Sequence, residues 1–281
     1  MRQFLVFIVP KTLGTYFNLV ALLSMEKAGL LAMQTFAKVR RSQLRNGKKI
    51  PLLDQAKSEI LEVSGMQIQS YHWPGDKDSV LLLHGWESNT NRWRNLVQSM
   101  CQEGYNIYAI DAPAHGNSTG TYHLLPDYVE AAYQLTQKHH IKHLIGHSMG
   151  GMAILYLLYK HQNTSVRSFV TLGAPGDFSL IVSGYQRRVP FNHRVYRALD
   201  AQMNKLVDMD IISFSSIRFA KHIPQKALIM HDRSDQTIPH TQSIAVHNAL
   251  SNSELVLTEK NGHSMHQAKV CEKISLFLAS N

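Results

Sequence analysis

Beginning at Ser58, short apolar runs alternate with amphipathic stretches of helical length. This alternation is typical of an α/β fold in which helices flank a largely parallel sheet. Residues 79–84 (SVLLLH) are apolar almost throughout, as expected for a strand buried on both faces. We therefore predict an α/β domain over residues 58–281. The predicted strands are 59–63, 66–73, 79–84, 106–110, 142–145, 166–172, 226–230 and 254–257, and the predicted helices are 92–102, 126–139, 149–161, 240–250 and 267–278.

Two segments depart from this rhythm. Residues 175–222 contain no clean buried strand and are rich in aromatic, methionine and basic side chains. An insertion of this length between two strands is usually functional, and we interpret it as a helical cap over the site. Residues 1–50 form an apolar and basic N-terminal helical arm, and Asn46-Gly47 marks a break after it. The length of 281 residues suits one large α/β domain with such additions.

The basic character of the chain is concentrated in the arm. The whole chain has a net charge of +9. Residues 1–50 hold nine basic residues and one acidic residue, Glu26, a net charge of +8 that leaves +1 for the remainder. This asymmetry indicates an anionic partner, either a membrane surface or nucleic acid; the alternative is a solvated helix face. Because the chain has no aromatic-interleaved basic motif or recognised DNA-binding pattern, we expect no nucleic-acid partner.

The apolar part of the arm favours a helix at a membrane surface. Residues 12–25 are too few and too polar for a spanning helix, which needs roughly 20 apolar residues. No clear cleavage site of a signal peptide follows them. Apolar side chains followed by the basic run 38–49 instead predict an interfacial amphipathic helix in peripheral contact with an anionic membrane. The alternative is a helix that packs on the α/β domain.

Cysteine and histidine usage bounds the compartment and the cofactors. Cys101 and Cys271 are the two cysteines, and neither lies in a CxxC pair, which favours a reducing compartment. We therefore expect a cytoplasmic protein that can associate with a membrane. The 16 histidines are scattered and show no HExxH or similar zinc spacing.

The pentapeptide Gly146-His147-Ser148-Met149-Gly150 is a G-x-S-x-G pattern between an apolar strand and a helical run. That context is the one a nucleophile elbow needs, because the chain must turn sharply to expose the serine above the strand ends. Side chains in place of the two glycines would collide in such a turn. The helix that follows directs its N-terminal amides toward developing negative charge. The pattern alone is not specific, so the assignment of Ser148 as nucleophile depends on what surrounds it.

Two loops supply that context. His84-Gly85-Trp86 closes the buried strand 79–84, and a catalytic serine needs two backbone N–H groups to hold the oxyanion. We predict that these donors are the amides of Met149 and Trp86. Residues 111–118 (DAPAHGNS) follow the next strand and are expected to form a tight loop beside the site.

The acid and the base are expected after two later strands. Residues 231–239 (HDRSDQTIP) place Asp235 just beyond a strand end, where a carboxylate can orient an imidazole and stabilise its charged form. Asp232 is the alternative acid, or a cap of its own loop. Gly262 permits a turn that directs His263 back to Ser148. The order Ser…Asp…His supports His263 as base over the other candidates, which are His231, His240, His247 and His266.

Together these motifs resemble the α/β-hydrolase superfamily, and HGW (84–86) with GHSMGG (146–151) is similar to its carboxylesterase and lipase branch. The resemblance covers about four-fifths of the chain, from Ser58 onward, and excludes the arm. It implies Ser148, His263 and Asp235 as triad, the Trp86 and Met149 amides as oxyanion hole, and no metal or organic cofactor. The chain departs from the family in the altered D-x-x-G-H-G-x-S loop, and in Asp232 where many relatives carry glycine.

The expected activity is hydrolysis of a carboxylic ester with a short-to-medium acyl or lipid-like group, such as a lysophospholipid or monoacylglycerol. The same triad also serves acyltransferases, lyases and C–C bond hydrolases, because a fold does not determine one reaction. Haloalkane dehalogenases and epoxide hydrolases are disfavoured, since those families place aspartate where Ser148 stands. A binding protein without catalytic activity is a further alternative, against which the intact triad argues.

Overall fold

The computed structural model describes residues 2–40, 44, 50–162 and 164–281, so the break expected at Asn46-Gly47 lies outside the described residues. The chain divides into two compact units. The sheet unit comprises Val39–Gly176 and Ser216–Asn281. The helical unit joins the residues up to Lys38 with Asp177–Ser215, two segments that are far apart in the sequence.

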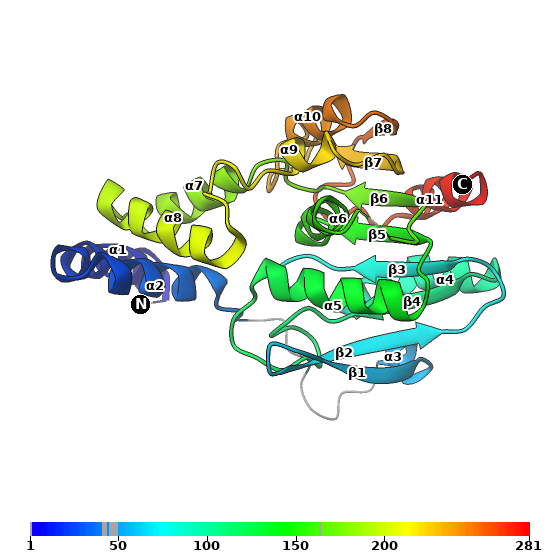
Figure 1. Ribbon diagram of the computed structural model, residues 1–281, viewed down its shortest axis with the longest axis horizontal. Helices are drawn as coiled ribbons and strands as arrows, with labels where there is room; N and C mark the ends of the chain where they lie inside the picture. Colours follow the sequence, from blue (N-terminus) through cyan, green and yellow to red (C-terminus); the bar gives the residue numbers. More distant parts are fainter. Residues whose placement is uncertain (1, 41–43, 45–49, 163) are drawn as a thin grey trace. The chain divides into compact units, whose positions relative to one another are not determined.

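The described residues of the sheet unit form one eight-stranded sheet of order β1-β2-β4-β3-β5-β6-β7-β8 (Figure 1). Neighbouring strands from β4 to β8 are parallel, and β2 pairs antiparallel with β1 and β4. This mostly parallel sheet confirms the predicted fold class. The strands are β1 (Lys57–Val63), β2 (Met66–Trp73), β3 (Ser79–Leu83), β4 (Asn106–Ile110), β5 (His143–His147), β6 (Ser168–Leu172), β7 (Lys226–Asp232) and β8 (Ser253–Thr258).

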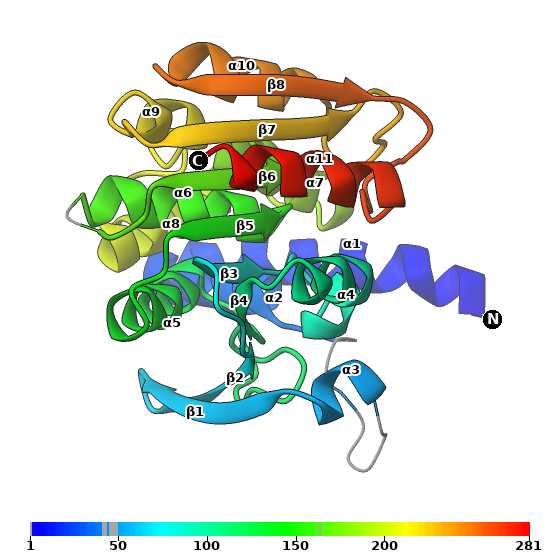
Figure 2. The same cartoon turned by 90° about the vertical axis from the view of Figure 1, so that its right-hand side faces the viewer.

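Helices cover both faces of this sheet. Helices α4 (Arg94–Gln102) and α11 (Ala268–Ala279) pack together on one face, as Figure 2 shows. Helices α5 (Leu125–Lys138) and α6 (Met149–Lys160) pack together on the other, where α6 also contacts α9 (Ser216–Ala220), which in turn contacts α10 (Thr241–Ala249). Two short helices, α3 (Pro51–Asp54) and η1 (Thr90–Trp93), complete the described elements of this unit and were not predicted.

The core follows the alternation of side chains along the strands. In β3, Val80 and Leu82 join the cluster beneath α4 and α11, together with Met100 and Ile274. Successive side chains of a strand point to opposite faces, so Leu81 and Leu83 face the other layer, and both are fully buried. Burial on both faces explains why this strand is a continuous apolar run, and why the sequence identified it clearly.

The helical unit is built from α1 (Arg2–Leu23), α2 (Met25–Ala37), α7 (Phe178–Arg188) and α8 (His193–Val207). Small residues let α2 approach α8 closely: a Cβ atom on Gly29 would stand 2.3 Å from the carbonyl oxygen of Ala198. The Tyr185 hydroxyl donates to the carbonyl oxygen of Ala32 at 3.1 Å, which ties α7 to α2. Helices α1 and α2 of the arm therefore pack with the insertion. That the insertion covers the site stays a prediction.

Candidate active site

Ser148 stands at a sharp turn between β5 and α6. Its backbone has φ 53° and ψ −117°, a conformation that is rare for a residue with a side chain. The two flanking glycines make the turn possible. A Cβ atom on Gly146 would lie 2.5 Å from the carbonyl carbon of Gly150, and one on Gly150 would lie 2.0 Å from the carbonyl oxygen of Leu83. The turn has the steric character expected of a nucleophile elbow.

Three side chains from three strand ends meet at this turn. The Nε2 atom of His263 lies 3.1 Å from the Oγ atom of Ser148. Its Nδ1 atom lies 2.7 Å from Oδ2 of Asp235. An ionised carboxylate only accepts hydrogen bonds, so Nδ1 carries the proton and the unprotonated Nε2 can accept from the serine hydroxyl. Ser148 follows β5, Asp235 follows β7 and His263 follows β8, so the parallel strands bring these residues to one edge of the sheet.

The carboxylate of Asp235 is buried and accepts four hydrogen bonds. Oδ1 accepts from the backbone N–H groups of Thr237 at 2.7 Å and Ile238 at 3.0 Å. Oδ2 accepts from His263 and from Nε2 of His231, at 3.1 Å. Burial by itself raises the pKa of a carboxyl group, but these hydrogen bonds outweigh it and hold the pKa of Asp235 well below its usual range. Asp235 is therefore a permanent anion beside the imidazole of His263.

Asp232, the alternative acid, has different partners. Its Oδ2 atom accepts from the Thr258 hydroxyl at 2.8 Å and from the Asn261 backbone N–H at 2.9 Å, and its Oδ1 atom accepts from Ser234. Burial acts to raise the pKa of Asp232, but these hydrogen bonds lower it to about 2. Asp232 thus serves as a cap of its own loop, and it also holds the loop that carries His263.

The loop after β3 passes directly beside the elbow. A Cβ atom on Gly85 would lie 3.0 Å from the Cβ atom of Ser148. His84 fixes this loop by donating from Nδ1 to the Gly85 carbonyl oxygen at 2.7 Å, while its Nε2 accepts from the Ala112 N–H at 2.9 Å. Burial, reinforced by nearby His115, lowers the pKa of His84 to about 3, so this imidazole is neutral. Trp86, the predicted oxyanion donor, is the next residue of this loop.

His115 supports the other end of the same loop. Its Nε2 atom accepts from the Glu87 N–H at 3.0 Å, and its Nδ1 atom donates to the Pro113 carbonyl oxygen at 2.8 Å. Burial lowers the pKa of His115 as well. Met149 directly follows Ser148 and is the first residue of α6, and the first N–H groups of a helix have no acceptor within it. That the amides of Trp86 and Met149 form the oxyanion hole stays a prediction.

Comparisons with known proteins place this geometry in a family. The family model described as the alpha/beta hydrolase fold matches residues 78–205. A monoacylglycerol lipase, abhd6-B of Xenopus laevis, is 26% identical over 69% of this chain and 58% of its own length. A pimeloyl-[acyl-carrier protein] methyl ester esterase of Aeromonas salmonicida is 32% identical over 37% of this chain and 41% of its own. The chain therefore has the α/β-hydrolase fold, and its residues 78–205 are similar to that family.

Solved structures agree with this assignment at the level of the fold. A putative lipase from Acinetobacter baumannii superimposes with a TM-score of 0.63 at 18% identity, over 82% of this chain and 93% of the lipase. The ferulic-acid complex of Est1E from Butyrivibrio proteoclasticus gives a TM-score of 0.64 at 14% identity, over 79% of this chain and 98% of Est1E. The chain spans about half the length of the curated relatives that it matches.

The chain retains the Asp111 loop despite its altered sequence. The buried carboxylate of Asp111 accepts from the backbone N–H groups of Thr90 at 2.8 Å and Asn117 at 2.9 Å, and from the Tyr71 hydroxyl at 2.9 Å. Ala114, which replaces a glycine of the family pattern, has a φ of 64°, a region that favours glycine. The hydrogen bonds around Asp111 hold the loop in this conformation without that glycine.

Sequence reasoning missed the side chains that support His263, the predicted base. The Nε2 atom of His147 donates to the backbone carbonyl oxygen of His263 at 2.7 Å. Arg92 donates to the carbonyl oxygen of Ser264 at 2.8 Å. His147 occupies the variable position immediately before Ser148, and that adjacency was the available signal. Of the other candidate bases, His266 is exposed, and the buried His231 contacts the same oxygen of Asp235, Oδ2, as His263 does.

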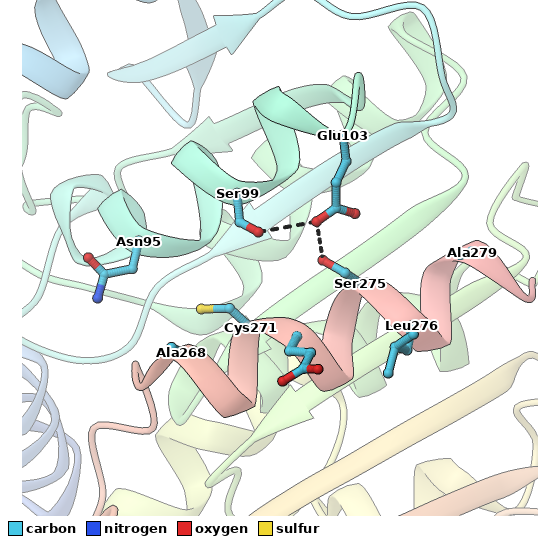
Figure 3. A pocket seen from close by; sticks show the side chains of 9 residues that line it. Asn95, Ser99, Glu103, Ala268, Cys271, Ser275, Leu276 and Ala279 are labelled. Atoms are coloured by element: carbon cyan, nitrogen blue, oxygen red, sulfur yellow. Dashed lines mark hydrogen bonds between the residues drawn. The ribbon is translucent and has the colours of Figure 1, made fainter.

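A separate groove of about 470 Å³ lies between α4 and α11. Figure 3 shows Glu103 at its edge, where the carboxylate accepts from Ser99 at 3.1 Å and Ser275 at 2.8 Å. None of the five predicted site residues lines it. The bond from Ser275 of α11 to Glu103 at the end of α4 joins the two helices, and we interpret the groove as a feature of helix packing.

Proposed function

We propose that this protein hydrolyses carboxylic esters, with Ser148 as nucleophile, His263 as general base and Asp235 as the residue that orients the base. The observation that carries the proposal is the continuous hydrogen-bonded chain from Ser148 Oγ through His263 to Asp235, with distances of 3.1 and 2.7 Å. The match to the α/β-hydrolase family model and the relatives named as lipases and esterases support the same reaction.

The reaction proceeds by two acyl transfers. Ser148 Oγ attacks the ester carbonyl carbon while His263 Nε2 takes its proton, and the N–H groups of Trp86 and Met149 hold the oxyanion. The C–O bond to the alcohol then breaks, and His263 protonates the leaving oxygen. Water attacks the acyl-enzyme with His263 again as base, which releases the carboxylic acid and regenerates the serine.

The direct test is fluorophosphonate labelling with mapping of the modified residue, together with turnover of p-nitrophenyl butyrate. We expect the label on Ser148. The Ser148→Ala variant should lose most of a roughly 10⁶-fold rate enhancement, because a triad without its nucleophile is almost inactive. Ser280→Ala, in which the residue caps the end of α11, is the control and should keep full turnover. Retention of more than about a tenth of the turnover by Ser148→Ala refutes the assignment.

For the substrate, we propose a medium-chain or lipid-like acyl ester. Support comes from the relative named as a monoacylglycerol lipase, which aligns over 69% of this chain. A panel of p-nitrophenyl esters from acetyl to dodecanoyl, with monoacylglycerol and lysophospholipid beside it, tests this. We expect kcat/KM to rise beyond the acetyl ester. A maximum at acetyl, with no release of fatty acid from the two lipids, contradicts a lipid-like substrate.

We also propose a cytoplasmic location and contact of the arm with an anionic membrane surface. Both cysteines are free thiols, in keeping with a reducing compartment. Helix α1 buries Phe17 and Ala21, while its exposed face carries Tyr16, Leu19 and Leu23, of which Leu19 is 59% and Leu23 92% exposed. Positions 16, 19 and 23 share one face of a helix. Among the helices that the structure describes, none is long and apolar enough to span a bilayer.

Charge decides between the possible occupants of this face. Residues 1–50 carry nine basic residues and one acidic residue. A second copy of the chain would bring like charges together, whereas an anionic lipid surface attracts the arm and receives the apolar side chains. The preferred partner is therefore a bilayer that contains anionic lipid.

Sedimentation with vesicles tests this partner. We expect pelleting with phosphatidylcholine vesicles that contain phosphatidylglycerol, less without it, and loss of pelleting in a Leu19→Asp, Leu23→Asp variant. Leu276→Asp on α11, where the side chain is 62% exposed, is the matched control and should pellet like the natural protein. Equal pelleting of all three proteins overturns the proposal. The proposal is also overturned if the double variant loses pelleting and, without vesicles, has a lower oligomeric mass than the natural protein. Leu19 and Leu23 then mediate self-association.

A further inference from the structure

Asp235 has a second imidazole partner that the proposed mechanism does not use. His231 lies near the end of β7 and is fully buried. Its Nε2 atom lies 3.1 Å from Oδ2 of Asp235 and 3.0 Å from the carbonyl oxygen of Ile238. Both partners are acceptors, so Nε2 carries a proton. On the other side of the ring, Nδ1 lies 2.7 Å from the Ser243 hydroxyl of α10 and accepts from it.

The resulting chain of contacts is symmetric in residue type about the aspartate, with a histidine and then a serine on each side. Its members are Ser148, His263, Asp235, His231 and Ser243. Its successive distances are 3.1, 2.7, 3.1 and 2.7 Å. Both imidazoles donate to the same oxygen, Oδ2, while two backbone N–H groups hold Oδ1. A carboxylate with donors on both oxygens has no free direction in which to rotate.

We propose that His231 is a positioning residue for catalysis, which holds Oδ2 of Asp235 at Nδ1 of His263. This inference rests on the proposed function, in which Asp235 orients the base. The hydrogen bond from His231 also spreads the negative charge of a buried carboxylate, and this keeps Asp235 ionised while His263 gains a proton. His147 and Arg92 act on the base loop from the opposite side, through the backbone of His263 and Ser264.

The donor function of His231 can be separated from its packing. In His231→Leu the ring volume is largely kept but the donor is lost. In His231→Gln the side-chain amide N–H group reaches the position of Nε2 and restores the hydrogen-bond donor. We expect kcat of the leucine variant to fall about 10²-fold, the effect of a misplacement of about 1 Å at a reacting group, with KM changed less than about threefold. The glutamine variant should recover kcat to within about tenfold of the natural protein.

Ser243→Ala provides an independent variant if leucine prevents folding. Loss of the serine hydroxyl leaves Nδ1 without its donor, so the imidazole can place its proton on either nitrogen. We expect a fall in kcat of about fivefold, equivalent to one neutral hydrogen bond, again with KM nearly constant. Thermal unfolding of each variant establishes that it is folded at the assay temperature.

The outcomes separate this inference from the proposed function. If Ser148→Ala keeps its turnover, the triad itself is wrong. If Ser148→Ala is inactive while folded His231→Leu keeps kcat within about twofold, the triad stands and the positioning role of His231 is overturned. Equal losses in folded leucine and glutamine variants also overturn it, because His231 then acts through ring packing. Where leucine prevents folding, an unchanged kcat in Ser243→Ala has the same meaning.

Discussion

Replacement of Asp235 by asparagine changes one oxygen of the carboxylate into an NH₂ group with almost no change in size. The two backbone N–H groups at Oδ1, from Thr237 and Ile238, cannot alter their protonation. The amide oxygen of the new side chain must therefore take the Oδ1 position. Its NH₂ group then faces the Nδ1–H of His263 and the Nε2–H of His231, where Oδ2 stood.

Two facing donors cannot form a hydrogen bond, so His263 must move its proton from Nδ1 to Nε2. The Nε2–H then points at Ser148 Oγ, 3.1 Å away, and cannot accept the serine proton. A triad with the wrong tautomer loses roughly 10⁴ in kcat. This loss corresponds to about 5.4 kcal/mol of transition-state stabilisation. Because the three residues remain in place, we expect KM to change little.

The assay is the steady-state turnover of p-nitrophenyl butyrate, with the rate of fluorophosphonate labelling as a second measure. Asp232→Asn is the matched control, because Asp232 is also buried and bonded but has Ser234, Thr258 and Asn261 as partners. Its kcat should fall less than about tenfold. The reasoning is refuted if folded Asp235→Asn keeps more than about a tenth of the natural kcat, or if both variants lose activity equally.

Two further predictions concern stability. The pKa of Asp232 in the folded protein is about 2, below its ordinary value of 3.8. The ionised Asp232 therefore contributes on the order of 2 kcal/mol to the free energy of unfolding above about pH 4, and this contribution is lost as the pH falls toward 2. In urea unfolding, the free energy of unfolding of Asp232→Asn should fall less between pH 4 and pH 2 than that of the natural protein. An identical fall contradicts this prediction. Gly150→Ala places a Cβ atom 2.0 Å from the Leu83 carbonyl oxygen and should cost about 3 kcal/mol. Gly184→Ala on α7 is the control, because its Cβ atom meets nothing nearer than 3.7 Å, and it should stabilise the protein by up to ~1 kcal/mol. If thermal unfolding shows similar changes in stability for the two variants, the steric argument is wrong.

The strands and the elbow were readable from the sequence because their causes are local. Residues 79–84 are apolar because β3 is buried on both sides, and the predicted strand differs from the observed one by a single residue. The hairpin turn between β1 and β2 at Ser64-Gly65 has positive φ at both residues, as a two-residue type I′ turn requires. At the elbow, the space around positions 146 and 150 excludes any side chain. Such constraints act within a few residues and directly restrict which residue types can occupy these positions.

The tertiary structure decided matters that depend on direction and on distant partners. Asp232 and Asp235 are three residues apart at one strand end and both are buried, so only the course of the loop determines which carboxylate faces His263. His231 resembled an alternative base in the sequence, but it is buried in β7 and bonds Oδ2 of Asp235.

The helical arm shows the same division between local and distant information. Its apolar spacing predicted helices, and residue type alone indicated that one face is apolar. The pairing of α2 with α8 arises from the fit of small residues such as Gly29 against the backbone of Ala198, about 170 positions away in the chain. A sequence therefore records which positions avoid water or exclude side chains, because each residue meets those conditions by itself. Which distant partner completes a contact depends on the path of the whole backbone, and only the folded structure supplies it.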